Sequence, residues 1–173
     1  MIYIVRHGET DWNKERRIQG HQDIPLNDKC IEEAKITRDK LKDVEFDLVF
    51  SSPLKRAYET ARIITNKPIR IDERLIERNN GKLEGLINED KYTPIRRYDE
   101  LIGDLGLEKV SDVRKRVESF FEEIKEKYPK KSILVVTHAG VGIQIRCYFE
   151  GDIDKNDYQK YYISNGEVIT YVN

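Results

Sequence analysis

The chain has 173 residues and a net charge of −1, with 38% hydrophobic and 36% charged residues. This length fits one domain with a full-sized core, the composition excludes a disordered chain, and the charge gives no general attraction to nucleic acid. No apolar run approaches the roughly 20 residues of a membrane span. Cys30 and Cys147 show neither a disulfide nor a metal-site pattern. Since no signal peptide is recognisable, we expect a cytoplasmic location.

The first residues of the chain combine a strand with reactive side chains. Ile2 to Val5 is a short apolar, β-prone run that leads directly into Arg6-His7-Gly8. Side chains at the end of such a strand point into the crevice where ligands of α/β proteins bind. The arginine offers a fork of donors for phosphate or carboxylate, and the histidine can act as a base, acid, metal ligand or nucleophile.

A polar loop and a helix follow this strand. The loop reaches to about Leu26, and we interpret His21 within it as a solvated residue rather than a catalyst. Asn27 is a suitable N-cap for a helix predicted over Asp28 to Asp43, with Cys30 on its buried face.

The second strand is predicted over Phe46 to Phe50. In the helix after it, Ser52 is the predicted N-cap and Pro53 the first residue, and the end lies near Thr65. Arg56 falls in the first turn, where the helix N-terminus already favours anions. The predicted inner face of this helix consists of Leu54, Ala57, Tyr58, Ala61 and Ile64.

The rest of the chain continues the alternation of strands and helices. Strands are predicted over Ile69 to Ile71, Ser132 to Val136 and Val168 to Val172, and helices from an N-cap at Ser111 to Pro129 and over Gly142 to Phe149. This pattern predicts an α/β fold, a three-layer sandwich whose mostly parallel central sheet has helices on both faces. The carboxyl ends of parallel strands share one edge of the sheet. The topology alone therefore brings together Arg6, His7, Arg56 and His138.

Four segments resemble motifs of the histidine phosphatase superfamily, which has the phosphoglycerate mutase-like fold. They are RHGET at Arg6 to Thr10, SSPLKRAYET at Ser51 to Thr60, the block from Glu77 to Gly85, and THAG at Thr137 to Gly140. The resemblance is to the small broad-specificity phosphatases of that family. It implies that His7 is a nucleophile that takes up a phosphoryl group, that Glu77 is the proton donor, and that Glu84 is structural.

The other expected site residues bind the phosphoryl group or the rest of the substrate. Arg6, Arg56 and His138 would supply up to three positive groups. Substrate contacts are expected from Asn13, Gln19, Gly20, Arg78, Arg96, Arg97, Ala139 and Gly140. Arg96 and Arg97 fit either a carboxylate-binding pair or a solvated charge cluster, and the sequence does not fix which ring nitrogen of His7 is phosphorylated.

These features predict a metal-independent phosphomonoesterase that acts on small phosphorylated metabolites through phosphohistidine. We expect no metal or other cofactor, because the two arginines would disfavour a cation beside His7, His138 and Glu77. We expect the chain to bind a small-molecule phosphomonoester and to bind neither nucleic acid nor a membrane. A homodimer is left open. One alternative is a 2,3-bisphosphoglycerate-dependent phosphoglycerate mutase, and another is a non-catalytic domain that binds phospho-ligands or a partner.

The extent of the chain favours the phosphatase over the mutase. We expect a single domain over residues 1–173, with a short active-site insertion at about 87–107. The family's mutases have a larger insertion and a C-terminal tail over the site, which keep water from the phosphoenzyme. With less cover we expect water to accept the phosphoryl group.

Overall fold

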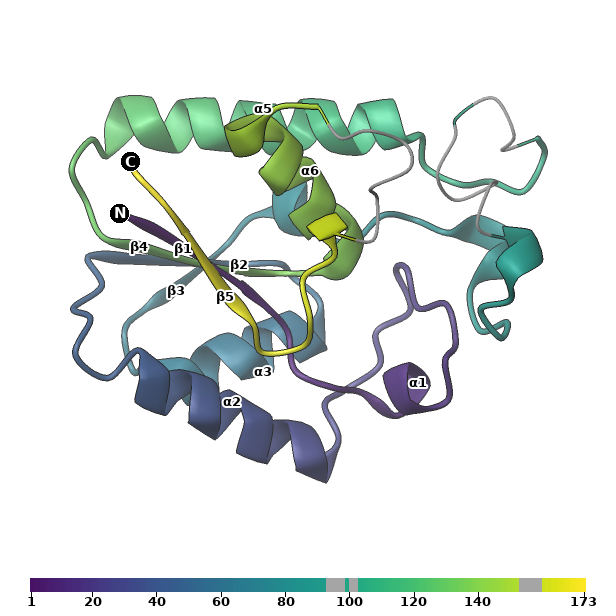
Figure 1. Cartoon of the computed structure of the whole chain (residues 1–173), viewed down its shortest axis with the longest axis horizontal. Helices are drawn as coiled ribbons and strands as arrows, with labels where there is room; N and C mark the ends of the chain where they lie inside the picture. Colours follow the sequence, from purple (N-terminus) through teal and green to yellow (C-terminus); the bar gives the residue numbers. More distant parts are fainter. Residues whose placement is uncertain (93–98, 100–102, 153–159) are drawn as a thin grey trace.

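The computed structural model describes residues 1–92, 99, 103–152 and 160–173. In this part of the chain a five-stranded sheet forms the centre of the fold, in the order β3-β2-β4-β1-β5 (Figure 1). Four strands are parallel: β1 (Ile2–Arg6), β2 (Leu48–Ser51), β3 (Ile69–Ile71) and β4 (Ile133–Thr137). The last strand, β5 (Val168–Tyr171), pairs antiparallel with β1 at the edge.

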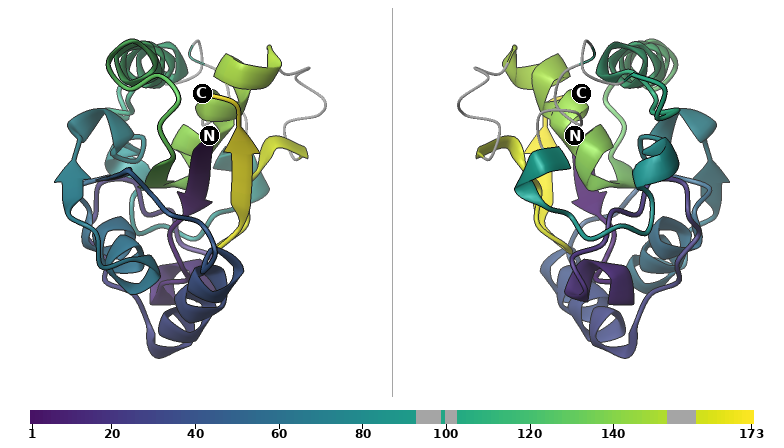
Figure 2. Two further views of the ribbon diagram at one scale, coloured as in Figure 1. Left: turned by 90° about the vertical axis from the view of Figure 1, so that its left-hand side faces the viewer. Right: turned by 90° about the vertical axis from the view of Figure 1, so that its right-hand side faces the viewer.

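Helices cover both faces of this sheet. α5 (Val110–Lys127) and α6 (Ala139–Glu150) lie on one face, and α2 (Asp28–Lys40) and α3 (Lys55–Ile64) on the other (Figures 1 and 2). The predicted α/β sandwich is confirmed. Shorter elements lie beyond the strands' carboxyl ends: α1 (Asp11–Lys14) and the 3₁₀ turns η1 (Glu73–Leu75), η2 (Gly81–Leu83) and η3 (Asp90–Tyr92). None of the helices in the described part of the chain has an apolar stretch of membrane-spanning length.

Alternating side chains of β1 supply both halves of the core. Ile2 and Ile4 face α5 and α6, where they join Phe120 and Phe121, which are fully buried. Val5 faces the other way and packs in the cluster that includes residues of α2's end and of α3. Burying each large apolar side chain stabilises the fold by roughly 1.5–3 kcal/mol. A sheet packed on both faces holds its strand ends in fixed positions.

The start of α3 differs from the prediction because Ser52 has another role. The helix begins at Lys55 with Leu54 as its N-cap, rather than at Pro53 after a Ser52 cap. The Ser52 hydroxyl instead contacts the His138 ring and accepts a hydrogen bond from the Leu54 N–H. Its side chain is thus drawn toward the strand ends.

The buried residues of α3 also differ from those predicted for its inner face. Tyr58, predicted on this face, is 37% exposed, whereas Thr60, which is not predicted there, is fully buried. The Thr60 hydroxyl donates to the Arg56 carbonyl at 2.7 Å and accepts from the Gly8 N–H at 3.1 Å. These two hydrogen bonds satisfy the buried hydroxyl, and the second one holds the loop after β1.

Two more helices begin elsewhere than predicted. The α5 helix starts at Val110, and the Asp99 carboxylate accepts hydrogen bonds from the Val110 and Ser111 N–H groups, so the predicted Ser111 cap is wrong. The α6 helix starts at Ala139, three residues before the predicted start, because extended backbone at His138 makes that residue the N-cap.

The Asn27 cap of α2 is confirmed, since its side chain accepts from the Cys30 N–H at 3.0 Å. This helix ends at Lys40, three residues before the predicted Asp43. The second strand is also shifted, because β2 spans Leu48–Ser51 rather than Phe46 to Phe50.

Candidate active site

The register of the central strands brings the two expected histidines together. β1 and β4 pair with Arg6 opposite Thr137, and the His7 N–H donates to the Thr137 carbonyl at 2.9 Å. His7 and His138, the residues that directly follow these two strands, are therefore neighbours. The rings of His7 and His138 lie with their centroids 5.1 Å apart.

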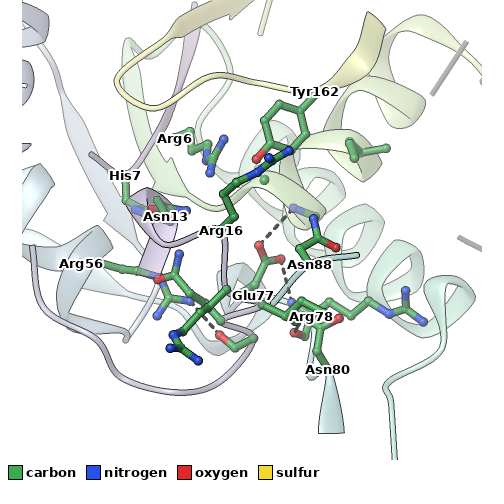
Figure 3. Close-up of a pocket in the computed structure, with 17 residues that line it drawn as sticks. Arg6, His7, Asn13, Arg16, Arg56, Glu77, Arg78, Asn80, Asn88 and Tyr162 are labelled. Atoms are coloured by element: carbon green, nitrogen blue, oxygen red, sulfur yellow. Dashed lines mark hydrogen bonds between the residues drawn. The ribbon is translucent and has the colours of Figure 1, made fainter. Parts of the chain in front are cut away.

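A cavity of about 370 Å³ opens at this edge of the sheet (Figure 3). His138 is buried and is not among the residues that line it. Arg96 and Arg97 lie outside the described residues. Every other expected site residue lines the cavity: Arg6, His7, Asn13, Gln19, Gly20, Arg56, Glu77, Arg78, Ala139 and Gly140.

His7 is held as a neutral imidazole with a defined tautomer. Its Nδ1 lies 2.6 Å from the Gly8 carbonyl oxygen, which can only accept, so we assign the ring proton to Nδ1. Burial, followed by the charges of Arg56 and Arg6, lowers the pKa of His7 well below 6.5. The other nitrogen, Nε2, then keeps a lone pair.

The loop after His7 is packed too closely for any residue but glycine at position 8. A Cβ on Gly8 would lie 1.7 Å from Cys30 Sγ. Cys30 is fully buried, and burial raises the pKa of its thiol to about 12, so it is uncharged at neutral pH. The sequence-based assignment of Cys30 as a small core residue is confirmed.

Arg56 is fully buried, and its guanidinium is oriented by the loop after α1. Nη1 and Nη2 donate to the carbonyls of Gln22 and Gly20, both at 2.7 Å, and Nε donates to His138 Nδ1 at 3.3 Å. Burial lowers the pKa of Arg56 to about 10, which still leaves it protonated at neutral pH. These contacts fix a positive charge beside His7.

His138 differs from the expectation that it adds a positive charge. Because Nδ1 accepts from Arg56, the ring proton is assigned to Nε2, which donates to the Ser52 hydroxyl at 2.7 Å. Burial, followed by the nearby charge of Arg56, lowers the pKa of His138 well below 6.5. His138 is thus neutral and orients Arg56.

Arg6 has donor capacity left for a ligand. Its Nη1 donates to the Ile163 carbonyl at 2.8 Å, and its guanidinium carbon lies 4.7 Å from the centre of the Tyr162 ring. Within the described part of the chain the buried Nε–H of Arg6 has no acceptor. Because buried donors are nearly always paired, this N–H is suited to an oxygen of a bound anion.

Glu77 is held by two backbone donors. Oε1 accepts from the Arg78 N–H at 2.8 Å and Oε2 from the Gly140 N–H at 3.1 Å (Figure 3). A Cβ on Gly140 would lie 2.6 Å from Oε1, so a larger residue here would displace this carboxylate. The interpretation of His21 as solvated is wrong: the ring is half-buried, and its Nε2 donates to the Glu77 carbonyl at 2.7 Å.

Glu84 ties the loop after α1 to the segment that carries Glu77. Its carboxylate accepts from the N–H groups of His21 at 2.9 Å, Gln22 at 3.2 Å and Asn80 at 3.0 Å. Gly20 has a φ of +58°, and a Cβ there would lie 2.0 Å from Glu84 Oε1. This agrees with the structural role that the resemblance implies for Glu84.

Asn13 and Gln19 are oriented by Thr10. The Thr10 hydroxyl accepts from the Asn13 N–H at 3.2 Å, the Asn13 side chain accepts from the Thr10 N–H at 3.1 Å, and Gln19 Oε1 lies 3.0 Å from that hydroxyl.

Sequence reasoning missed seven of the residues that line the cavity. They are Arg16, Arg17, Ile18, Asn80, Asn88, Ile143 and Tyr162. The one signal in the sequence for any of them was the pair of adjacent arginines, Arg16 and Arg17, in the loop after α1.

Comparison with known proteins agrees with this geometry. The family model of the histidine phosphatase superfamily (branch 1) matches residues 2–172. Phosphoglycerate mutase-like protein 4 of Arabidopsis thaliana is 38% identical over 165 residues, which cover 86% of this chain and 69% of that protein. The uncharacterized phosphatase PhoE of Bacillus subtilis is 36% identical over 140 residues, covering 79% and 70%. The structure of YhfR from Bacillus stearothermophilus superposes with a TM-score of 0.84 at 31% identity, covering 96% and 88%. The chain belongs to the histidine phosphatase superfamily, and it is a phosphatase by class.

Proposed function

We propose that this phosphatase hydrolyses small phosphorylated metabolites through a phosphohistidine on Nε2 of His7, without a metal ion. The observation that carries the proposal is the hydrogen bond of His7 Nδ1, from which the tautomer of the ring is assigned. Its Nδ1–H is committed to the Gly8 carbonyl at 2.6 Å, and the low pKa of the ring keeps Nε2 unprotonated. An unprotonated nitrogen beside two guanidinium groups is what attack on a phosphate dianion requires.

In the first step, Nε2 of His7 attacks phosphorus and forms the N–P bond while the P–O bond to the leaving group breaks. Arg6 and Arg56 stabilise the charge on the phosphoryl oxygens, and the Nε–H of Arg6, which has no acceptor among the described residues, is available for one of them. Glu77, in its protonated form, gives its proton to the departing oxygen. The product alcohol then leaves.

In the second step, water attacks phosphorus and the N–P bond breaks. The Glu77 carboxylate takes a proton from this water, so the residue returns to its protonated form. Inorganic phosphate leaves, and His7 regains its neutral tautomer through the Gly8 carbonyl. No step requires a metal ion, because the two guanidinium groups supply the positive charge.

The test combines turnover with chemical trapping. Purified protein should release phosphate from p-nitrophenyl phosphate at the same rate with and without excess EDTA, and rapid quenching should trap an acid-labile, base-stable phosphoryl group on His7. His7→Ala should remain folded and lose both activity and label. A label on serine or aspartate, or activity lost to EDTA and restored by zinc or magnesium, would contradict the mechanism.

A second assay separates hydrolysis from isomerisation. With 3-phosphoglycerate and a catalytic amount of 2,3-bisphosphoglycerate, the proposal expects inorganic phosphate as the main product. Formation of 2-phosphoglycerate much faster than phosphate would identify a mutase.

A further inference from the structure

The cavity carries more positive charge than one phosphate group needs. Arg6 and Arg56 lie at the His7 end, and Glu77 is the only acidic residue among the described residues that line the cavity. Three more arginines line its walls: Arg16, Arg17 and Arg78. A dianion at His7 is balanced by the first pair of guanidinium groups. Any part of this additional charge that has no acidic partner within the protein is available to a second anionic group of a ligand.

The three outer arginines differ in what they contact. Arg17 donates through Nε to Glu15 at 2.5 Å and through Nη1 to the Gly85 carbonyl at 2.8 Å. Arg78 donates through Nε to the Glu108 carbonyl at 2.6 Å. For Arg16, no residue in the described ranges accepts a hydrogen bond from the guanidinium or pairs with it. The side chain of Arg16 reaches toward Tyr162 at the mouth of the cavity (Figure 3).

The backbone at Arg16 has a conformation that normally selects glycine. α1 ends in a Schellman motif, in which the Arg16 N–H donates to the Asn13 carbonyl at 3.0 Å and the Arg17 N–H to the Trp12 carbonyl at 2.7 Å. Residue 16 occupies the left-handed position of this motif, with a φ of +58°. Glycine or asparagine adopts this conformation with less strain, so the arginine brings a side chain to the rim at a conformational cost.

The Arg16 main chain is also fixed on its other side. The Asn88 N–H donates to the Arg16 carbonyl at 2.7 Å, and the next residue, Arg17, forms an antiparallel bridge with Ile87. The root of the Arg16 side chain is therefore held in place, and the long side chain above it presents to the cavity a guanidinium that pairs with no residue of the described ranges.

We propose that Arg16 is a specificity residue, which binds a second anionic group of the substrate while the scissile phosphate lies at His7. This inference rests on the proposed function and narrows its substrates to phosphomonoesters that carry a carboxylate or a second phosphate. A guanidinium binds either group through two parallel hydrogen bonds.

Two matched substrate pairs test the inference. 3-Phosphoglycerate and glycerol 3-phosphate differ by a carboxylate in place of a hydroxymethyl group, and fructose 1,6-bisphosphate and fructose 6-phosphate differ by one phosphate. The measured quantity is the selectivity ratio, kcat/KM of the substrate with two anionic groups divided by that of its partner. We expect the wild type to exceed unity for at least one pair, and that pair identifies the second group.

Variants at position 16 are chosen to preserve the left-handed backbone. Arg16→Asn removes the charge with a residue that tolerates this conformation, and should lower the selectivity ratio roughly tenfold, the effect of one charge-assisted hydrogen bond. The loss should lie mainly in KM. Arg16→Lys should keep part of the ratio. The matched control is Arg62→Asn, at an exposed arginine of α3 outside the cavity, which should leave the ratio unchanged.

Three outcomes would overturn the inference. One is a wild-type ratio near one for both pairs, another is an Arg16→Asn variant with an unchanged ratio, and the third is an equal loss on both members of a pair, which would indicate general attraction of anions. If the wild type hydrolyses no monoester, the proposed function fails instead. Dissociation constants of the same four compounds, measured by calorimetry on His7→Ala with and without Arg16→Asn, then decide the role of Arg16 without turnover.

Discussion

The imidazole rings of His7 and His138 lie with their centroids 5.1 Å apart, and both are buried beside the guanidinium of Arg56. Burial and this charge lower the pKa of each ring well below 6.5. In the proposed mechanism, this arrangement keeps the attacking nitrogen of His7 unprotonated while Arg56 remains available to bind phosphate. It also makes folding depend on pH, because both rings must stay neutral in the folded state.

The free energy of unfolding should therefore fall as the pH drops below 6.5. The unfolded chain takes up protons on these histidines at pH values where the folded chain does not, so stability rises with pH between the lowered folded pKa and 6.5. Each histidine contributes up to about 1.4 kcal/mol per pH unit in that window. Urea denaturation of wild type and His138→Gln between pH 8 and 5 measures the effect. A stability difference between the two proteins that is independent of pH would contradict it.

The same shift should appear in the rate. Since the attacking nitrogen of His7 must be unprotonated, kcat/KM should stay near its maximum as the pH falls through 6.5 and decline only at lower pH. Initial rates with p-nitrophenyl phosphate in buffers of constant ionic strength measure this limb. A decline centred at or above 6.5 would show that a histidine of ordinary pKa controls the reaction.

Glu77→Gln should slow alkyl phosphate hydrolysis by roughly 10²–10⁴-fold, the usual range for general acid–base catalysis. The amide can still accept one backbone hydrogen bond at this place but cannot supply the proton. p-Nitrophenyl phosphate should be affected less, because its leaving group needs less protonation. The measurement is kcat/KM for glycerol 3-phosphate and for the aryl ester. Equal losses of kcat/KM on the two substrates would show that Glu77 is not the general acid.

Gly8→Ala should destabilise the fold through a single contact. The new Cβ would lie 1.7 Å from Cys30 Sγ, and overpacking of this kind costs about 1–3 kcal/mol. Cys30→Ala removes that sulfur, so the double variant should recover part of the loss, although Cys30 Cβ at 3.2 Å remains close. Urea denaturation of the four proteins gives the coupling energy. Strictly additive effects would mean that the contact does not determine the loss.

The inner site could be predicted from the sequence because its residues follow strong local patterns. Arg6 and His7 end one apolar strand, His138 ends another, and Arg56 lies in the first turn of a helix. Parallel strands end at one edge, so these residues need no long-range information to be placed together. That the expected residues line one cavity agrees with this reasoning.

The residues that could not be predicted act through partners distant in the sequence. Asp99 caps α5 from eleven residues away, and Ser52 serves His138 rather than its own helix. His21 donates to the carbonyl of Glu77. Periodicity and capping rules describe neighbours in the chain, so they assign such side chains to local roles. Arg16 was missed for a related reason, since its left-handed backbone is visible only in the folded loop.

We expect Glu84 to link stability to phosphate binding, because its carboxylate holds the loop that orients Arg56. Its half-buried carboxylate accepts three backbone N–H groups, and two of them belong to His21 and Gln22. Arg56 in turn donates to the carbonyls of Gly20 and Gln22. Loss of the carboxylate should therefore loosen the acceptors that hold Arg56.

Glu84→Ala should lower the free energy of unfolding by about 1–3 kcal/mol, because it removes the acceptor of three backbone donors. It should also raise KM for p-nitrophenyl phosphate. Glu84→Gln keeps one acceptor oxygen and should lose less of both. Urea denaturation and steady-state kinetics at pH 7 measure the two effects, with Glu32→Ala, an exposed position on α2, as the control. If Glu84→Ala loses stability but keeps the wild-type KM, the loop does not transmit the change to Arg56.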